Sequence, residues 1–408
     1  MSIRAVALGL ALAVSYSASP VAAWELDPRG SSQLRLSPTF KQAFALPGLS
    51  YSRLRFDLSA ELSARVHVDF SYEHQVIARG TSSSSPFGPF LASMSAVPYR
   101  LVPEPRSVVA WPPSLAWTHA VDRAAFSFTW SDIDLTVGRQ ALGLGRGLFF
   151  GAVDVFAPFS PLSVDREWRP GVDAIHLDWR FADLYSFDVM AAAGEGFDEG
   201  VALGRLRGYL GEVDAALVGG RRAEDWVMAM MGSAALGDAA VHVEVAAYLT
   251  DGRGVPASIS EDGRWVLKGL LGASYSLDVA AGLSLAAEYH YNGFGLEDVS
   301  TGTGWFLDRA FQERLARGDG QTLGQHTLGV SLQLSTEAEV QLGVMAVQNL
   351  RDASGAVAPS VVWVVSDSVT LTATGFFPWG AGASGELPLQ SEYGAGEASG
   401  LIQLAIYE

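Results

Sequence analysis

Apolar and polar side chains alternate one by one along most of the chain. In the range 283–292, the odd positions carry Leu, Ala and Tyr, and the even positions carry Ser, Ala, Glu, His and Asn. Successive side chains of a β-strand point to opposite faces of its sheet, so this period of two predicts a strand with one apolar and one polar face. The same alternation recurs in residues 54–62, 65–73, 174–181, 241–247 and 327–335. The chain is therefore predicted to be all-β.

The alternating segments and the turn residues between them predict 18 strands. They span residues 31–39, 51–62, 64–74, 115–130, 132–141, 172–181, 184–193, 201–209, 212–220, 225–235, 239–250, 265–276, 281–292, 323–335, 338–348, 356–366, 368–377 and 399–407. Short turns alternate with longer links, which include 40–50, 75–114, 142–171, 293–322 and 378–398. This alternation is typical of a closed barrel whose two ends lie on the same side of a membrane. The first strand is weakly patterned, so 16 strands is the alternative.

Strands of this pattern occur in two kinds of structure. A soluble sheet buries its apolar face in a core, whereas a membrane barrel turns that face to lipid and its polar face to the lumen. Many of the predicted strands are long enough to cross a membrane at a tilt. Aromatic residues near strand ends, such as Trp130, Trp226 and Tyr289, are typical of interface girdles. We therefore predict a closed antiparallel transmembrane β-barrel with long extracellular loops, in preference to a secreted soluble β-sandwich or solenoid.

The N-terminus has the order of a secretion signal. Arg4 is followed by an apolar run at 5–14 and by the small residues Val21, Ala22 and Ala23, which predict cleavage after residue 23. No later stretch is apolar over 18 consecutive residues. These features predict a cleaved signal peptide at 1–23 and a single barrel domain at 24–408. They also predict export to the outer membrane of a Gram-negative-type bacterium, with the barrel-assembly machinery as a partner during biogenesis.

Composition excludes several classes of protein. The 408 residues include no Cys, which excludes a disulfide scaffold, a thiol nucleophile and a cysteine metal site. The net charge of −17 argues against a nucleic-acid partner, because such proteins present basic surfaces. Gly143, Gly145 and Gly147 superficially suggest a phosphate-binding turn, but no helical pattern follows them, so we predict no nucleotide cofactor. A short amphipathic helix is predicted at 305–317, ending at Gly318.

The polar faces of the predicted strands supply candidate lumen residues. They are Arg55, Asp57, Arg65, His67, Asp69, His176, Asp178, Arg180, His242, Glu244, Glu288 and His290. The four histidines lie on strands far apart in the chain, so we interpret them as wetted polar side chains and predict no metal site. The spacing of serine, histidine and aspartate residues indicates no catalytic triad, so we predict that the protein is not an enzyme. A barrel-embedded hydrolase is kept as an alternative.

The most informative segment runs from the end of one predicted strand to the start of another. It contains Val137-Gly138-Arg139-Gln140, a glycine-rich stretch at 141–147, and Arg169-Pro170-Gly171. This region resembles that of alginate-export-like outer-membrane barrels. The resemblance implies a porin-like barrel of 18 strands whose third outer loop, 142–171, folds into the lumen. The implied constriction candidates are Arg139, Arg146, Asp154, Asp165, Arg166, Glu167 and Arg169. The competing interpretation is that these charges tie the loop to the wall.

These patterns together predict a porin-like channel for passive diffusion of small hydrophilic solutes through a lumen narrowed by loop 142–171. Outer-membrane lipid and lipopolysaccharide are the expected surroundings, and no cofactor is implied. Alginate is not supported as cargo, because the predicted lumen faces mix acidic and basic residues whereas a polyanion favours a positive lumen. The alternatives are a plugged barrel that serves as a receptor, adhesin or assembly scaffold, and the barrel-embedded hydrolase.

Overall fold

A computed structural model describes residues 33–46, 49–79, 99–102, 106–107, 115–156, 167–194, 199–257, 259–260, 263–382 and 389–407. The predicted signal peptide lies outside these described residues. None of the helices among them has the length and apolar character needed to span a membrane.

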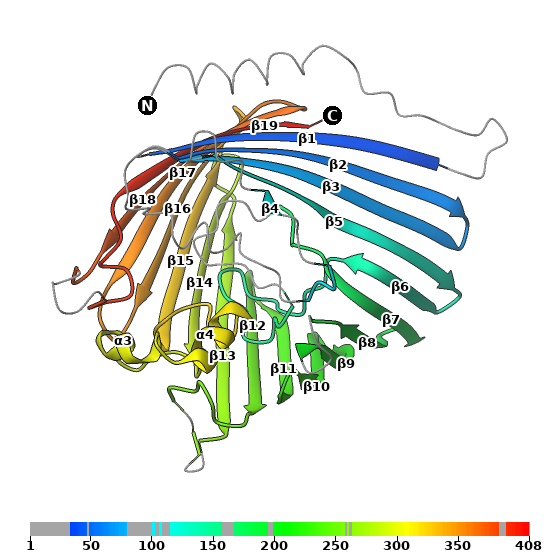
Figure 1. Ribbon diagram of the computed structural model, residues 1–408. Coiled ribbons are helices and arrows are strands. Elements are labelled where there is room, and N and C mark those ends of the chain that lie inside the picture. Colours follow the sequence, from blue (N-terminus) through cyan, green and yellow to red (C-terminus); the bar gives the residue numbers. More distant parts are fainter. Residues whose placement is uncertain are drawn as a thin grey trace.

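Antiparallel strands make up almost the whole described chain and form one sheet (Figure 1). Helical segments occur in the link after β14, and they are η2 (Val299–Thr301), α3 (Gly302–Trp305) and α4 (Arg309–Ala316). The strands are β1 (Gln33–Leu46), β2 (Leu49–Ser63), β3 (Val66–Arg79), β4 (Arg106–Ser107), β5 (Leu115–Trp130), β6 (Ile133–Gln140), β7 (Val172–Ala182), β8 (Tyr185–Ala192), β9 (Val201–Leu210), β10 (Val213–Arg222), β11 (Asp225–Leu236), β12 (Ala239–Leu249), β13 (Trp265–Leu277), β14 (Leu283–Asn292), β15 (His326–Ser335), β16 (Val340–Asn349), β17 (Gly355–Ser366), β18 (Val369–Trp379) and β19 (Ser399–Tyr407).

The first strand closes the sheet into a barrel, because β1 pairs with β2 on one edge and with β19 on the other. At this seam Thr39 lies opposite Tyr407, and Ala45 lies opposite Leu401. Within the described chain the sheet has 19 strands, but β4 is a two-residue strand beside β5, so 18 long strands form the wall. The predicted closed barrel of 18 strands is confirmed, and the alternative of 16 is wrong.

One boundary differs from its prediction. β1 continues to Leu46 and β2 begins at Leu49, so the long link predicted at 40–50 is wrong. Pro38 lies inside β1, where it supplies no backbone donor, and proline in a strand interior is uncommon enough to suggest a strand end. The prediction that 115–130 is one continuous strand is confirmed by β5.

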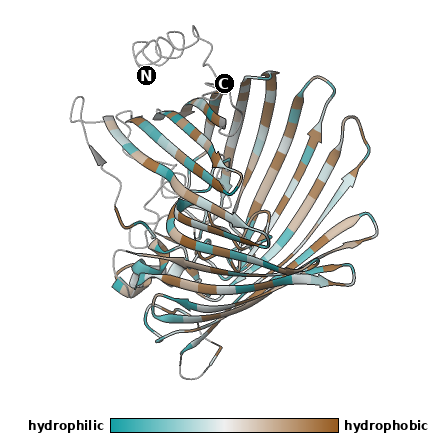
Figure 2. Ribbon diagram, turned by 90° about the vertical axis from the view of Figure 1, so that its right-hand side faces the viewer, coloured by the Kyte–Doolittle hydropathy of each residue, from teal (hydrophilic) through white to brown (hydrophobic). Residues whose placement is uncertain are grey.

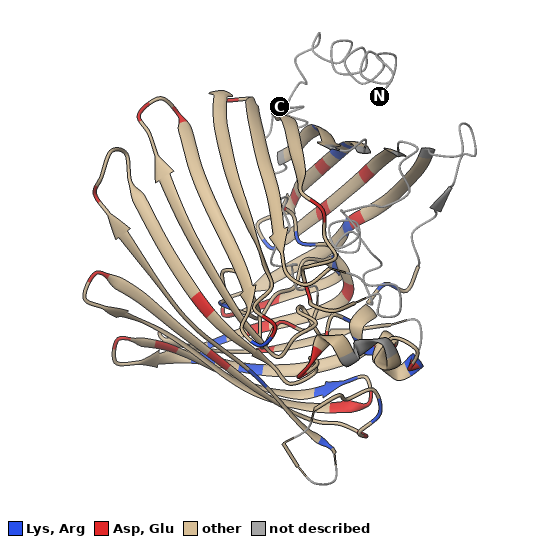
Figure 3. Cartoon of the chain, turned by 90° about the vertical axis from the view of Figure 1, so that its left-hand side faces the viewer, with Lys and Arg blue, Asp and Glu red and all other residues tan. Residues whose placement is uncertain are grey.

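The outer face of the wall is apolar over much of its circumference, whereas the inner face carries both buried charged side chains and a buried apolar cluster. On β11, Trp226, Met228 and Met230 are exposed and alternate with buried side chains. On β12 and β14, Glu244 and Glu288 are buried on the opposite face. Figure 2 shows the alternation of hydropathy along the strands, and Figure 3 shows long stretches of strand without charged residues. A soluble sheet has the reverse arrangement, so the exposed apolar face is the one that meets lipid.

The predicted helix at 305–317 is present as α4, preceded by the single turn α3. Asp308 caps α4, because its side chain accepts a hydrogen bond of 2.9 Å from the backbone N–H of Phe311. The helix stops before Gly318, whose φ of 78° lies in the left-handed region that glycine tolerates. Phe311 and Arg314 form its buried face.

Replacing Leu217 with arginine tests which face of the wall meets lipid. Leu217 is 60% exposed within β10, and an arginine at mid-depth on a lipid face destabilises a barrel by roughly 2–4 kcal/mol. The matched control is Leu236→Arg, because Leu236 is 72% exposed next to the Gly237 turn, where the loss is about 0–1 kcal/mol. Unfolding by guanidinium chloride in lipid vesicles measures both, and equal small losses would contradict a lipid-facing wall.

Candidate functional site

Loop segment 141–156 lies inside the barrel, held by two glutamates of the inner wall (Figure 1). The Oε1 atom of Glu244 accepts hydrogen bonds from the backbone N–H groups of Arg146 and Gly147. Its Oε2 atom accepts from Ala152 and Val153, at 2.8 and 3.1 Å. One buried carboxylate therefore satisfies four backbone donors of an irregular segment that has no strand partner.

Glu288 binds the middle of the same segment. Its carboxylate accepts hydrogen bonds from the backbone N–H groups of Leu148, Phe149 and Phe150, the last two at 2.8 and 3.2 Å. A further hydrogen bond of 2.7 Å joins its Oε1 to Nε2 of His242. Two lumen-facing candidates from the sequence, Glu288 and His242, are thus brought together, and their role is to hold the loop.

Apolar and cationic side chains complete the attachment. Phe149 and Phe150 belong to a buried cluster with Leu270 of β13, and the ring of Phe150 stacks on His290 at a centroid distance of 4.9 Å. Lys268, buried on β13, donates a hydrogen bond of 3.5 Å to the carbonyl of Gly151. His290 is therefore a packed core residue and not a wetted one, which corrects its interpretation from the sequence.

The constriction candidates in this segment are engaged in ion pairs. Arg146 donates two hydrogen bonds to Asp214 of β10, at 2.6 and 2.8 Å, and one to Ser233 of β11. The hydrogen bond to Asp214 raises the pKa of Arg146 above its usual value. Asp154 accepts a hydrogen bond from Arg169, so the described parts of the loop before residue 157 and after residue 166 contact each other.

The far end of loop 142–171 reaches the opposite wall. Glu167 pairs with Lys41 of β1 at 2.6 Å and accepts a hydrogen bond of 3.0 Å from the hydroxyl of Tyr407. The ring of Trp168 lies 4.0 Å from Nζ of Lys41 and 4.9 Å from the guanidinium of Arg55. The loop therefore contacts both sides of the barrel. Two further candidates, Asp165 and Arg166, fall outside the described residues.

Arg139 is placed differently from the other candidates. It is the penultimate residue of β6, opposite Asp173 of β7, and its guanidinium donates two hydrogen bonds of 2.7 Å to that carboxylate. By strand parity, both residues share a face with Val137 and Ile175, which are exposed on the outer wall. Arg139 thus lies in the wall facing outward and not on a lumen constriction, because the wall register continues up to the end of β6.

The inner faces of β2 and β3 carry polar candidates at opposed positions. Arg55 lies opposite Glu73 and donates hydrogen bonds to Glu73, Asp57 and Asp122. The sequence prediction missed Asp122, which lies where the pairing of β5 with β3 shifts register between Ser71 and Tyr72. Arg65 is the exception among the candidates, because it lies in the turn between the two strands.

His67 is the one candidate near both a serine and an acidic group within β2 and β3. Its Nε2 atom lies 3.3 Å from Oγ of Ser59 and 3.0 Å from Oδ1 of Asp69. A catalytic triad needs the acidic group on one ring nitrogen and the hydroxyl on the other. Here both contacts are to the same nitrogen, so the arrangement does not activate the serine.

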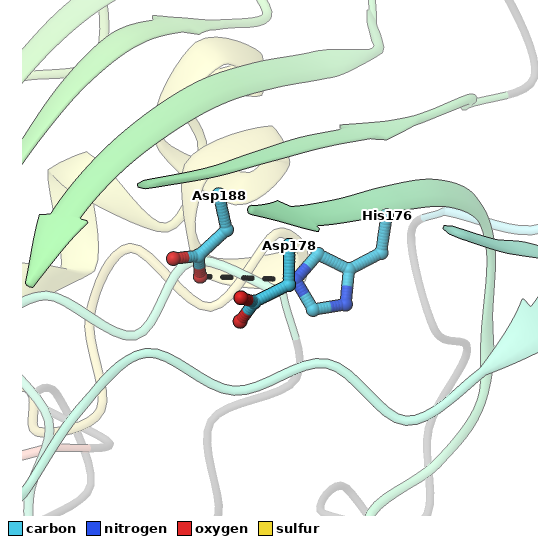
Figure 4. Close-up of side chains that lie close together, drawn as sticks. All are labelled: His176, Asp178 and Asp188. Carbon is cyan, nitrogen blue, oxygen red and sulfur yellow. Dashed lines mark ion pairs between the residues drawn. The ribbon is translucent and has the colours of Figure 1, made fainter. Parts of the chain in front are cut away.

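Two lumen candidates, His176 and Asp178 of β7, meet Asp188 of β8, which the sequence prediction missed; Figure 4 shows the polar atoms of the three side chains close together. Two arginines of β9 occupy the same group. Arg205 donates to Asp188 at 2.8 Å, and Arg207 pairs with both Asp188 and Asp178. The arginines neutralise the carboxylates that a cation would need, so these residues do not fit a metal site. Arg205 and Arg207 are the chain neighbours of Leu206, which is exposed on the outer face. The alternation of side chains along a strand therefore places both arginines on the inner face.

Arg180 lies near the short turns between strands, where it pairs with Asp134 of β6 at 2.5 Å and is about half exposed. This contact is a surface ion pair of small energetic value.

A second inward-folded segment lies between β14 and β15. Arg222, buried at the end of β10, pairs with Asp319 and donates a hydrogen bond of 2.9 Å to the hydroxyl of Tyr99. Arg314 of α4 pairs with Asp225 at 2.8 Å. The ion pairs hold the helical loop over the ends of β10 and β11. Sequence reasoning missed them because they join residues 97 and 89 positions apart.

Comparison with known proteins identifies the fold. No protein-family model and no curated protein matches the chain. Among solved structures, OccK5 (OpdH) of Pseudomonas aeruginosa is 8% identical with a TM-score of 0.51, and the match covers 92% of this chain and 98% of that one. A double variant of OccD1 (OprD) gives 10% and 0.53 over 92% and 94% of the two chains. OccK11 (OpdR) of P. aeruginosa gives 8% and 0.50 over 92% and 95%. The chain thus has a porin-like barrel fold.

Glu244→Ala should loosen loop segment 141–156. Removing one carboxylate leaves four backbone donors without that acceptor, and charge-assisted hydrogen bonds contribute about 1.5–3 kcal/mol each. We expect amide hydrogen exchange in residues 144–153 to accelerate at least roughly tenfold. Glu61→Ala, at an exposed acidic position of β2, is the control. If the Glu244→Ala barrel folds and its loop exchanges amide hydrogens at the wild-type rate, Glu244 does not hold the loop.

The contact between Glu224 and Arg317 should weaken in acid. Their two hydrogen bonds measure 2.7 and 3.0 Å. Burial acts to raise the pKa of Glu224, but the hydrogen bonds from Arg317 outweigh it and lower that pKa from 4.5 to about 2. The folded pKa is depressed, so the stabilisation is present above about pH 4.5 and is lost as pH falls toward about 2.

Hydrogen exchange of α4, corrected for intrinsic rate, measures this change at pH 5 and at acid pH. Wild type should lose protection in acid, and Glu224→Gln should show a smaller difference between the two conditions. The same pH dependence in both proteins would show that the other acidic groups of the loop control its docking.

Proposed function

We propose that the protein is an outer-membrane porin-like channel through which small hydrophilic solutes diffuse passively. The observation that carries this proposal is the position of loop 142–171. One end is clamped to β12 and β14 by Glu244 and Glu288, and the other reaches β1 through Glu167 and Lys41. A loop anchored on opposite walls narrows the lumen and leaves a restricted path beside it.

The open part of this path lies along β2 and β3. The side chains of Asp57, His67 and Asp69 are 33%, 37% and 45% exposed on the inner face. The side chains facing them across the barrel on β11 to β14 are buried by the loop. Because acidic groups outnumber basic ones among these exposed residues, we propose a preference for cations along this side.

The same loop places basic groups at the narrow region. Arg146 and Arg169 are partly exposed, at 19% and 24% of their side chains, although each pairs with an aspartate. They are therefore the residues of the predicted constriction that meet passing ions. Glu167 and Asp154 act as their counterparts and as anchors of the loop.

A plugged barrel is the second candidate function. Its supporting observation is a large apolar cluster inside the wall, to which Tyr99, Leu144 and Phe156 contribute from loops and Met190 from β8. Such packing favours a receptor, adhesin or scaffold if it extends across the whole lumen. The barrel-embedded hydrolase receives no comparable support, because the contacts of His67 do not form a catalytic relay.

The proposal includes three conditions of biogenesis. The signal peptide at 1–23 is removed, residues 24–408 fold as one domain, and the barrel-assembly machinery inserts this domain into an outer membrane that contains lipopolysaccharide. The likeness to alginate-export-like barrels supports a conduit. The mixed charges of the inner wall, such as Arg55 beside Glu73, do not favour a polyanion as cargo.

The double variant Arg146→Ala/Arg169→Ala tests the constriction. Removing two cations and their side-chain volume should raise single-channel conductance and move the reversal potential toward cation selectivity, because acidic partners are left uncompensated. Arg253→Ala/Arg309→Ala removes two exposed arginines of outer loops and serves as the control. Equal conductance and selectivity in all three proteins would place Arg146 and Arg169 away from the ion path.

A further inference from the structure

A large groove lies on the outer surface of the wall, over β5 to β10. Its volume is about 1260 Å³, and most of its lining is apolar. The lining residues Val137 and Ile175 are 38% and 52% exposed on the outward face. The groove is therefore separate from the inner face, where loop 142–171 is bound, and no part of the proposed channel uses it.

Small residues make this recess. Ala191, Ala193 and Ala202 line the groove together with Gly194 and Gly200. Farther along the same outward face, strands carry bulky exposed side chains such as Leu217. Five positions without a large side chain leave a hollow wide enough for an aliphatic chain in an otherwise bulky apolar surface.

A difference in strand length deepens the recess. β5 has 16 residues and β6 only 8, so the half of β5 that precedes Ala124 has no β6 neighbour. Segment 99–102 fills this part of the wall, because Arg100 pairs with Asp122 on the inner side and the N–H of Leu101 donates to Asp173 on the outer side. Leu101 and Val102, 63% and 68% exposed, form one lip of the groove.

Polar groups occur at the end of the groove nearest the outer loops. The Arg139–Asp173 pair forms its floor, and a hydrogen bond of 2.8 Å joins Tyr72 and His119 at one side. Arg221 lies at the other side, exposed and directly opposite the outward-facing Trp226. At about 3.3 Å per residue and a tilt of about 40°, the end of β6 lies roughly 20 Å from the periplasmic turn, near the outer border of a band about 25 Å tall.

We propose that this groove binds one acyl chain of an anionic phospholipid-type molecule in the outer leaflet, with the phosphate beside Arg221. The apolar recess matches an aliphatic chain, and its wall faces lipid. The cation and the neighbouring indole lie at the depth of lipid headgroups, where aromatic and basic residues contact phosphates. The proposal rests on the membrane placement of the proposed function, but it does not depend on an open pore.

Native mass spectrometry of the refolded full chain tests it, with phosphatidylglycerol or phosphatidylcholine of the same acyl chains as the added lipid. Wild type should retain one phosphatidylglycerol through detergent exchange. Ala202→Trp fills the recess and should reduce that retention at least tenfold. Ala247→Trp is the matched control, because Ala247 lies opposite the exposed Met228 on the same outward face of β12, away from the groove.

Arg221→Gln should retain phosphatidylglycerol no better than wild type retains phosphatidylcholine. If wild type retains both lipids equally, Arg221 does not bind the phosphate. Loss of lipid in Ala247→Trp as well, or no loss in Ala202→Trp, would overturn the groove as the site. A wild-type mass of two chains without lipid would assign the groove to a second copy. The groove lies outside the barrel, so Ala202→Trp should conduct ions as the wild type does. If both proteins bind lipid as stated but neither conducts, the proposed channel function fails and the lipid site stands.

Discussion

The pairing of β1 with β19 is the constraint on which the rest of the structure depends. In lipid, every backbone N–H and C=O of the wall needs a partner within the protein, and an open sheet edge leaves a row of them unpaired. The eight residue pairs from Thr39 with Tyr407 to Leu46 with Gly400 remove that edge. Once the sheet is closed, each strand has an outer face toward lipid and an inner face toward the lumen, and this decides where every alternate side chain lies.

Closure of the sheet also determines which groups can bind the loop inside the barrel. An irregular segment has no strand ladder to pair its backbone, so the N–H groups between residues 146 and 153 that face the wall need acceptors from it. Glu244 and Glu288 provide them, each with both carboxylate oxygens in use. Glu244 and Glu288 are therefore structural. In the proposed channel, the charged residues left to act on a solute include Asp57 and Asp69 on the wall and Arg146 in the loop.

The period of two was enough to predict the strands and the faces of most charged residues, because neighbouring side chains in a strand cannot share a face. It placed Glu244 and Glu288 inside without revealing what they bind, since their partners are backbone groups of a loop about 100 or more positions earlier. Arg139 was misassigned for a related reason. That assignment rests on a resemblance in residue types, which does not show on which face of the wall a side chain lies. The strand register places the side chain of Arg139 on the outer face with Val137. The second half of β1 was missed because its pattern is weak: Gln42 interrupts the apolar face that Phe40 and Phe44 would otherwise form.

If a continuous water path passes loop 142–171, the refolded barrel should conduct ions across a planar lipid bilayer. Heat-modifiable migration first shows that the barrel has folded. Stable discrete current steps are expected, with a reversal potential under a salt gradient that reports the charge of the narrow region. A silent bilayer from folded protein would contradict the channel and assign the interior packing around Tyr99 and Phe156 to a plugged barrel.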